Sequence, residues 1–460
     1  MRSMLQRATE HIIEHIGTLP DQPMHATKGG RKLARSLAGP MPEEGIPFEK
    51  LFRKLFSQII PASLNTASPG YLAYIPGGGI FHAAIADLIA DVTNRYVSVW
   101  IAAPGLAQLE ENVIQWFAAM LGMPSSAGGI LLTGGSLANL VATITARRVK
   151  LPPDFLRGTV YTSEEAHHSV LKAALLAGIL PENVRAIPTD DRYRMQPEML
   201  LDAIRRDRAA GLLPFLIVAS AGTTNTGAVD DLQRIADIAA AESLWLHVDA
   251  AYGGFFAMTE RGRKALAGIG RADSVTLDPH KGLFLPYGTG CLIVRDRESL
   301  RRAHAVPAAY MPPMQHDEGF VDFCELGPEL SRDARGLRVW LPFSMHGAGV
   351  FRNALDEKLD LAAYATNELR KMQGIEIVAE PVLSLLAFRA RFPTLNNADE
   401  DAKNRQLMSL VNQKQRVLLT GTVTKGRFLI RMCILSFRTH ADRIDMALED
   451  IRTSLDEVRQ

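Results

Sequence analysis

The sequence predicts an α/β fold built on a mostly parallel β-sheet. Between residues 125 and 294, short apolar runs alternate with segments of helical periodicity. Parallel strands are buried on both faces and need helical crossovers, so this alternation is typical of such a sheet. The predicted strands include residues 130–132, 160–162, 215–220, 244–248 and 292–294.

The segments on either side of this sheet predict smaller parts. Residues 1–60 are predicted to form two amphipathic helices joined by a basic turn and a proline-rich stretch, with little core of their own. After Trp340, a long helical pattern runs to about residue 372, and helices and apolar runs follow. We therefore expect an N-terminal helical arm (1–62), a large domain (63–345) and a small C-terminal α+β domain (346–460). Residues 306–332 are proline-rich and weakly periodic, which predicts a functional loop.

Composition limits the class of protein. The 460 residues are 47% hydrophobic and 22% charged, with a formal charge of +1, so no bias toward nucleic acid or anionic membranes is present. The three cysteines lack CxxC spacing, which argues against a disulfide framework or a zinc ribbon. No run of about 18 uncharged apolar residues or signal peptide is apparent. We expect a cytoplasmic protein whose partners are a small molecule and a second copy of the chain.

A glycine-containing turn follows the first predicted strand of the large domain. In Ile130-Leu-Leu-Thr-Gly134-Gly135-Ser136, the strand passes through two glycines into a helix. The free N–H groups and the dipole at a helix N-terminus attract anions, so a phosphate can rest on Gly135 and Ser136. The alternative is an ordinary strand-to-helix turn, since this is neither GxGxxG nor a Walker lysine loop, which also disfavours a nucleotide-binding module.

Two charged residues are predicted at the carboxyl ends of strands, where open α/β sheets bind ligands. Asp249 ends the run Leu244-Trp-Leu-His-Val-Asp249, although an aspartate there can also cap the next turn. Lys281 follows a β-prone run and precedes the apolar Gly282-Leu-Phe-Leu-Pro. Burial disfavours the charged ammonium group of a lysine, and the neutral amine that results can form a Schiff base. The alternative is a solvent-exposed lysine, which fits this apolar context poorly.

His167 begins another helix of the same domain and can stack on a flat ring. A zinc site would recruit His167, His168, His247, Asp249 and His280, but their spacings match no closed zinc pattern, so we predict no metal. A phosphate anchor, a ring clamp, an acid and a lysine are together what pyridoxal 5′-phosphate (PLP) demands of a protein. The four features therefore predict PLP as the cofactor.

These motifs resemble those of the PLP-dependent group II amino-acid decarboxylases, which include the aromatic-L-amino-acid decarboxylases. The most specific are His247-Val-Asp249-Ala-Ala251-Tyr252 and Asp278-Pro-His280-Lys281-Gly282. The similarity extends through Ser68-Pro-Gly-Tyr71-Leu-Ala-Tyr74-Ile-Pro76 and Arg335-Gly-Leu-Arg338-Val-Trp340 to Phe437-Arg-Thr. The resemblance implies the PLP-dependent transferase fold type I, with a seven-stranded sheet, and a homodimer with its active site at the subunit interface. The N-terminal arm (1–62), which has little core of its own, is expected at this interface.

The resemblance also implies a role for each matching residue. Lys281 would be the Schiff-base lysine, and Asp249 would lie on the pyridine nitrogen. Ala251 and His167 would contact opposite faces of the ring. Gly135, Ser136 and His280 match phosphate contacts, and Thr224 matches a residue near the ring and the substrate. Such an enzyme releases CO2 and then protonates Cα to give an amine.

The sequence departs from the family pattern in the predicted loop. In aromatic decarboxylases, a tyrosine on a mobile loop supplies the proton, and a gapless count back from Arg335-Gly-Leu337 places Phe323 at that position, with Tyr310 nearby. Relatives without this tyrosine tend to be aldehyde synthases, which release aldehyde, ammonia and peroxide alongside CO2. Phe323 therefore makes an aldehyde synthase the alternative to a decarboxylase.

The substrate is expected to be an aromatic L-amino acid. Tyr74, Ile75 and Trp100 match positions near the family's substrate pocket, although these residues can also be ordinary core. Pocket positions that are large aromatics in animal relatives are Thr66, Ile75 and Ser98 here. Two further alternatives are an aminotransferase, which would depend on a 2-oxo acid, and a silent PLP-binding scaffold, which would consume no amino acid.

Overall fold

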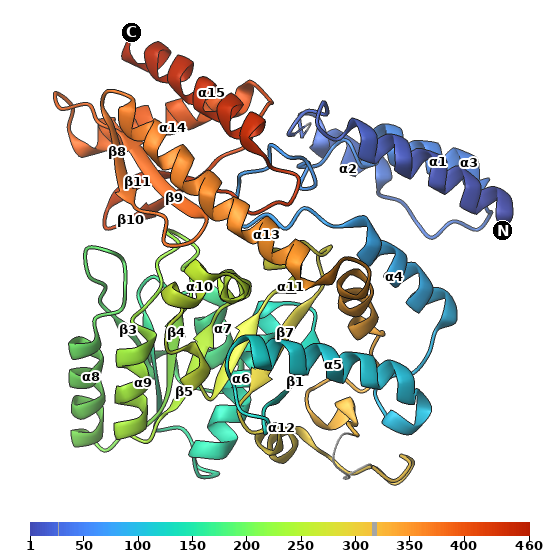
Figure 1. The fold of residues 1–460 in the computed structure, drawn as a ribbon, viewed down its shortest axis with the longest axis vertical. Helices are drawn as coiled ribbons and strands as arrows, with labels where there is room; N and C mark the ends of the chain where they lie inside the picture. Colours follow the sequence, from blue (N-terminus) through green and yellow to red (C-terminus); the bar gives the residue numbers. More distant parts are fainter. Residues whose placement is uncertain (26, 315–319) are drawn as a thin grey trace. The chain divides into compact units, whose positions relative to one another are not determined.

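The computed structural model describes residues 1–25, 27–314 and 320–460 (Figure 1). Two compact units divide the chain, each made of segments that are distant in the sequence. The large unit consists of Gly79–Thr366 and Ile377–Ala387, and the terminal unit of Met1–Gly78, Asn367–Glu376 and Phe388–Gln460. This division has two parts, whereas the sequence suggested three with boundaries after residues 62 and 345.

Two features explain the difference. Within the terminal unit, the backbone N–H groups of Met24 and Leu72 donate to the carbonyl oxygens of Gln415 and Leu418, so the arm is joined to the C-terminal region. The expected boundary at residue 345 falls inside α13 (Arg335–Lys371), close to its non-helical bend at Gly347.

The large unit contains a seven-stranded sheet in the order β1-β7-β6-β5-β4-β2-β3. Its strands are β1 (Gly128–Leu132), β2 (Gly158–Ser163), β3 (Val184–Ile187), β4 (Leu213–Ser220), β5 (Trp245–Asp249), β6 (Ser274–Leu277) and β7 (Gly290–Val294). All neighbouring pairs are parallel except the two that involve β7, which is antiparallel to β1 and β6. The predicted α/β class with a mostly parallel sheet is confirmed.

Helices flank this sheet (Figure 1). They include α5 (Pro104–Met120), α6 (Gly135–Lys150), α7 (His168–Leu176), α8 (Pro197–Ala209), α9 (Leu232–Ala241), α10 (Glu260–Ala265), α11 (Pro279–Gly282) and α12 (Arg297–His304), whereas α4 (Phe81–Thr93) lies apart from the sheet. Helix α6 packs across β4, β5, β6 and β7, while α8 and α9 lie side by side against β4. The core between sheet and helices is apolar and fully buried, with Ile130, Val160, Phe215 and Leu292 among its members.

A second sheet has four strands in the order β10-β11-β9-β8. Its strands are β8 (Ile375–Ala379), β9 (Leu385–Ala390), β10 (Thr420–Thr424) and β11 (Arg427–Cys433). Helix α14 (Asn397–Gln413) packs on β11 and on the last helix, α15 (Ala441–Arg459). The predicted mixture of helix and strand in the C-terminal region is therefore present.

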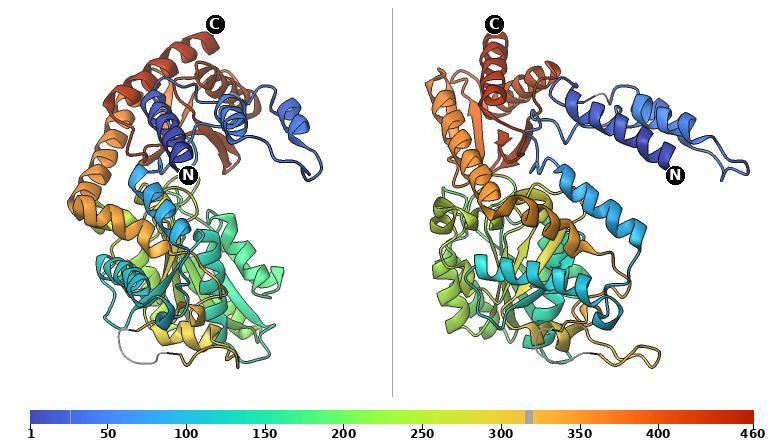
Figure 2. Two further views of the ribbon diagram at one scale, coloured as in Figure 1. Left: turned by 90° about the vertical axis from the view of Figure 1, so that its right-hand side faces the viewer. Right: turned by 45° about the vertical axis from the view of Figure 1, so that its right-hand side comes forward.

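The arm begins with α1 (Arg2–Thr18), α2 (Gly30–Leu37) and α3 (Phe48–Lys54). Figure 2 shows α1 running beside α3, and the ring of His11 lies 5.1 Å from that of Phe52. None of the residues of these three helices is buried, although Ile13 and Leu51 are exposed apolar side chains. No described helix is both long and apolar enough to cross a lipid bilayer.

Candidate active site

Three strands of the large unit end at one edge of its sheet. Strands β5 and β6 are parallel neighbours, and β1 has the same direction because both β1 and β6 are antiparallel to β7. Asp249 ends β5, Lys281 lies in the short α11 directly after β6, and Gly135 begins α6 after β1. Ligands of open α/β sheets bind at this edge, and the structure brings the three predicted residues to it.

The N-terminus of α6 forms a narrow cradle. No described side chain caps this end of the helix. A Cβ atom added at Gly135 would lie 3.0 Å from Asp278 Oδ2 and 3.2 Å from Ala251 Cβ, and one at Gly134 would lie 3.5 Å from His280 Cε1. The glycines therefore keep open a space next to unpaired helical N–H groups, which suits a phosphate.

Lys281 is held by an aspartate of its own motif. Its Nζ lies 2.8 Å from Asp278 Oδ2, and its side chain is 24% exposed, so the amine is both anchored and accessible. Asp278 Oδ1 is buried and has no hydrogen-bond partner among the described residues. Asp278 was not among the site residues predicted from the sequence, although it belongs to the Asp278-Pro-His280-Lys281 motif.

His280 lies beside the same aspartate. The carbonyl oxygen of Thr289 is 2.6 Å from His280 Nδ1, so Nδ1 carries the proton, and Nε2 lies 3.7 Å from Asp278 Oδ2. Burial lowers the pKa of His280. With the proton on Nδ1, Nε2 of the neutral ring can only accept a hydrogen bond, so the predicted contact with a phosphate oxygen requires His280 to gain a second proton on Nε2.

Asp249 is buried and oriented by two donors. Its Oδ2 accepts from Asn139 Nδ2 at 2.9 Å, and its Oδ1 accepts from the backbone N–H of Ala251 at 3.2 Å. Asn139 projects from the first turns of α6, and it was not among the site residues predicted from the sequence. Asn139 lies four residues after Gly135, so the two residues share one face of α6. This helical spacing could have identified Asn139 as the partner that the Asp249 carboxylate needs.

His167 is the N-cap residue of α7, and its Nδ1 lies 2.7 Å from Ser169 Oγ. Burial lowers the pKa of His167, while the nearby charges of Asp249 and Lys281 raise and lower it respectively. The predicted ring clamp therefore lies within electrostatic reach of both the acid and the lysine. Thr224 is half-buried in the turn after β4, a strand parallel to β5, so it lies at the same sheet edge.

The residues expected near the substrate fall in different units. Trp100 belongs to the large unit, where its backbone N–H donates to Asp322 Oδ1 at 2.6 Å and its ring lies 4.2 Å from that of Phe320. Tyr74 and Ile75 belong to the terminal unit. Tyr74 is 57% exposed and has a positive φ of 51°, whereas Ile75 is buried. Their contact with a substrate stays a prediction.

The structure places Phe323 in the core and not on the predicted loop. Its ring is fully buried in the core of the large unit, with the guanidinium of Arg332 5.0 Å from the ring centre. A gapless count placed Phe323 on a loop, but the chain has already returned to the core there and forms a short 3-10 helix from Phe323 to Glu325. A side chain inside the core cannot reach a substrate.

The predicted loop itself is described only in part. Residues 306–314 have no regular structure, and Tyr310 among them is 77% exposed. Residues 315–319 of the predicted loop lie outside the described residues. Tyr310 is therefore a solvent-accessible tyrosine on the segment where the resemblance places the proton donor.

The sheet-edge residues fit PLP as a set. The α6 cradle suits a phosphate, the buried and doubly bonded carboxylate of Asp249 suits a protonated ring nitrogen, and the anchored amine of Lys281 suits an aldehyde. A sequence model described as "Pyridoxal-dependent decarboxylase conserved domain" matches residues 31–391. The chain belongs to this family. Pyridoxal phosphate is thus its cofactor, and the enzyme is a carboxy-lyase, which removes the silent-scaffold alternative.

Individual relatives cover almost the whole chain. It is 35% identical to an aromatic-L-amino-acid decarboxylase of Bacillus atrophaeus over 100% of this chain and 96% of the relative. It is 29% identical to phenylacetaldehyde synthase of Petunia hybrida, over 96% and 92%. The crystal structure of Oryza sativa TDC with PLP and tryptamine superposes with a TM-score of 0.94 at 30% identity, over 100% of this chain and 98% of that one.

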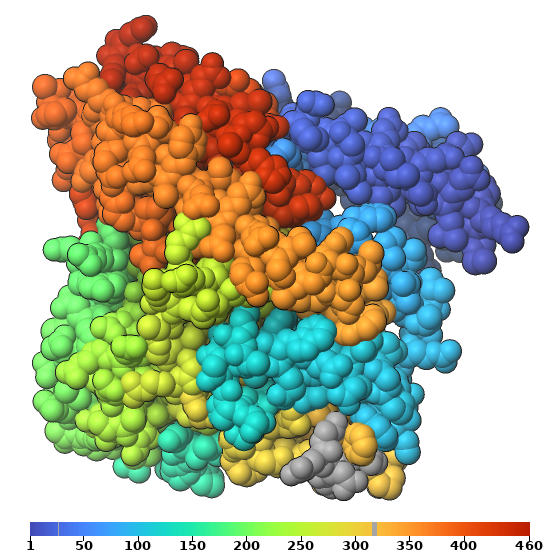
Figure 3. Space-filling model, in the orientation of Figure 1, coloured from blue at the N-terminus to red at the C-terminus, as the bar shows by residue number. Residues whose placement is uncertain are grey.

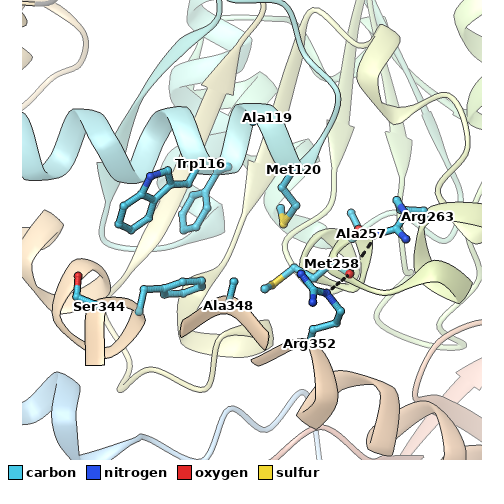
Figure 4. A pocket seen from close by; sticks show the side chains of 11 residues that line it. Trp116, Ala119, Met120, Ala257, Met258, Arg263, Ser344, Ala348 and Arg352 are labelled. Carbon is cyan, nitrogen blue, oxygen red and sulfur yellow. Dashed lines mark hydrogen bonds between the residues drawn. The ribbon is translucent and has the colours of Figure 1, made fainter. Parts of the chain in front are cut away.

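A separate cavity of about 650 Å³ lies between α5 and the bend of α13, which are adjacent on the face shown in Figure 3. In Figure 4, Trp116 projects into it from α5, and Arg263 and Arg352 both point at the carbonyl oxygen of Met258. Their nitrogen atoms lie 3.2 and 3.1 Å from that oxygen. The cavity shares no lining residue with the sheet-edge site.

Proposed function

We propose that this carboxy-lyase converts an aromatic L-amino acid to the corresponding amine and CO2. The observation that carries the proposal is the meeting of Lys281, Asp249 and the α6 cradle at one sheet edge. The choice of an aromatic substrate is supported by the relatives, which include an aromatic-L-amino-acid decarboxylase and a TDC crystallised with PLP and tryptamine.

Each site residue takes one part in binding or orientation. Lys281 holds the aldehyde of the cofactor through its amine, and Gly135, Ser136 and His280 hold the phosphate. When bound, the cofactor supplies a conjugated ring that accepts the electron pair left by departing CO2. The carboxylate of Asp249 keeps a proton on the ring nitrogen, since an anion stabilises the protonated form.

The remaining site residues confine the ring and meet the substrate. His167 and Ala251 contact its two faces, and Thr224 lies next to the ring and the substrate. Trp100 lies on the substrate side of the ring within the large unit. Asp278 Oδ2 lies 2.8 Å from the Lys281 amine and would hold this side chain whenever the amine is not bonded to the cofactor.

The last step is protonation of the substrate at Cα, and we assign the donor to the hydroxyl of Tyr310. Tyr310 is exposed on residues 306–314, whereas Phe323, the residue that suggested an aldehyde synthase, lies in the core. A phenylacetaldehyde synthase is among the relatives, but the burial of Phe323 argues against the reason for which the sequence suggested this activity. An amine product is therefore the better proposal.

We also propose that the enzyme is a cytoplasmic homodimer. Helices α1, α2 and α3 have no buried residue, and apolar side chains such as Ile13 and Leu51 are exposed on them. A second copy of the chain would remove this apolar surface from water. Sedimentation at several protein concentrations tests the dimer, and a purely monomeric protein would contradict it.

The test of function measures cofactor and products together. The purified protein, loaded with PLP, is incubated with a panel of L-amino acids while CO2, amine, aldehyde and peroxide are assayed. We expect stoichiometric CO2 and amine from an aromatic amino acid, and loss of both with Lys281→Ala. Lys264→Ala is the matched control, because Lys264 is exposed on α10 and pairs with Glu260. Aldehyde with peroxide as the main products would refute the decarboxylase assignment.

A second variant tests the proton donor. Tyr310→Phe removes only the hydroxyl of an exposed side chain, so the fold and cofactor binding should be unchanged. Loss of a positioned proton donor costs roughly 10²–10⁴-fold in rate. We expect amine formation to fall by about this factor, with aldehyde and peroxide rising in its place. An unchanged rate of amine formation would exclude Tyr310 as the donor.

A further inference from the structure

One buried amide connects the acid of the site to its ring clamp. Asn139 is 2% exposed and makes four side-chain hydrogen bonds, to residues from α7, β5 and β6. Its Nδ2 lies 2.9 Å from Asp249 Oδ2 and 3.0 Å from Ser169 Oγ. Its Oδ1 lies 2.8 Å from Thr276 Oγ1 and 3.0 Å from His247 Nε2. The amide therefore uses its full capacity of two donated and two accepted bonds.

The orientation of this amide follows from its charged neighbour. An ionised carboxylate can only accept hydrogen bonds, so Asn139 must present its NH2 group to Asp249. The flipped amide would set an oxygen atom against Asp249 Oδ2 in a buried site, which costs free energy because both atoms are acceptors. The carbonyl oxygen of the amide therefore faces Thr276 and His247.

His247 agrees with this orientation. Its Nε2 must donate to Asn139 Oδ1, which leaves Nδ1 to accept from Ser274 Oγ at 2.8 Å. The indole N–H of Trp245 donates to the same Ser274 oxygen at 2.8 Å, so the serine proton is free to point at His247. Burial lowers the pKa of His247 to about 4, which keeps the ring neutral, as one donor and one acceptor nitrogen require.

The other branch of the network ends at His167. Ser169 Oγ accepts from Asn139 Nδ2, so its own proton is available to His167 Nδ1 at 2.7 Å. The backbone N–H of Ser169 also donates to His167 Nδ1, at 3.3 Å. An imidazole nitrogen that accepts two hydrogen bonds cannot carry a proton, so the proton of neutral His167 is on Nε2.

We propose that Asn139 is a positioning residue that aligns the Asp249 carboxylate and, through Ser169, fixes His167 in its Nε2–H tautomer. The inference rests on the proposed roles of Asp249 and His167 at the cofactor ring. The Asn139 amide would thereby orient the Asp249 carboxylate toward the ring nitrogen of the cofactor. It would also make Nε2 the donor nitrogen of His167, which flanks the ring. A change at Asn139 alters both, although Asn139 itself need not touch cofactor or substrate.

Histidine ¹⁵N NMR of the cofactor-free protein tests the tautomer directly. The His167 signals are assigned by their absence from the spectrum of His167→Gln. We expect a protonated Nε2 and an unprotonated Nδ1 in the wild type. Ser169→Ala should populate both tautomers, and Ser169→Thr, which retains the hydroxyl, should restore the wild-type signal. A wild-type His167 with its proton on Nδ1, or an unchanged tautomer in Ser169→Ala, would overturn the proposal.

Cofactor titration tests the other end of the network. Asn139→Ala removes one hydrogen bond to the Asp249 carboxylate, which we expect to raise the dissociation constant of PLP about tenfold. Thr143→Val is the control, since Thr143 is buried on the same helix and its hydroxyl bonds only to the carbonyl oxygen of Asn139. Equal affinity in the two variants, with an unchanged His167 tautomer, would leave Asn139 without a positioning role and refute the inference. Because neither readout needs turnover, failure to form an amine would refute only the proposed function.

Discussion

The variant Phe323→Leu tests whether Phe323 stabilises the core of the large unit or takes part in the reaction. The ring is fully buried and lies 5.0 Å from the Arg332 guanidinium, so the variant loses a cation–π contact and the shape of the ring while staying apolar. A nearly volume-conserving core substitution costs up to about 1.5 kcal/mol, and a desolvated cation–π contact contributes up to about 2 kcal/mol. We expect the free energy of unfolding to fall by about 2–3 kcal/mol, with no change in the ratio of amine to aldehyde.

The assay pairs urea unfolding, followed by circular dichroism, with product analysis at a temperature where the variant is folded. Phe215→Leu is the control, since Phe215 belongs to the same buried cluster and Arg332 does not stack on it. The loss of unfolding free energy in Phe323→Leu, compared with that in Phe215→Leu, measures the contribution of the Arg332 contact. If Phe323→Leu shifted the products toward aldehyde and peroxide without loss of stability, the assignment of Phe323 to the core would be refuted.

Three further outcomes follow from the site. Gly135→Ala places a Cβ atom 3.0 Å from Asp278 Oδ2, and crowding of the cradle should weaken PLP binding roughly tenfold in an absorbance titration, whereas unchanged affinity would contradict the cradle. Asp249→Ala should lower kcat on the order of a hundredfold, since it removes the charge that stabilises a protonated ring nitrogen, and a kcat close to that of the wild type would contradict this role. The pKa of His247 is about 4 in the folded protein against an ordinary 6.5, so the unfolded chain binds more protons between these values. The free energy of unfolding should therefore fall by up to about 3 kcal/mol as the pH drops through that window, and urea midpoints that do not move between pH 7 and pH 4.5 would exclude this effect.

The sequence alone was sufficient for the sheet and for the main residues of the site. Apolar runs of strand length between helical segments are a local pattern, and they predicted the α/β class before any contact was known. Gly135, Asp249 and Lys281 were found because each follows a strand, and the ends of parallel strands meet at one edge. The specific motifs around Asp249 and Lys281 predicted the cofactor.

Tertiary structure decided what depends on contacts between distant residues. Asn139 and Asp249 are 110 positions apart, and no local pattern shows that an amide on α6 bonds a carboxylate on β5. Phe323 looked like a loop residue because proline-rich sequence has weak periodicity, yet hydrophobic burial draws this position into the core. The sequence thus determined the strands and the chemistry at their ends, whereas packing across the fold decided which polar side chains pair and which aromatic ring is withdrawn from the substrate.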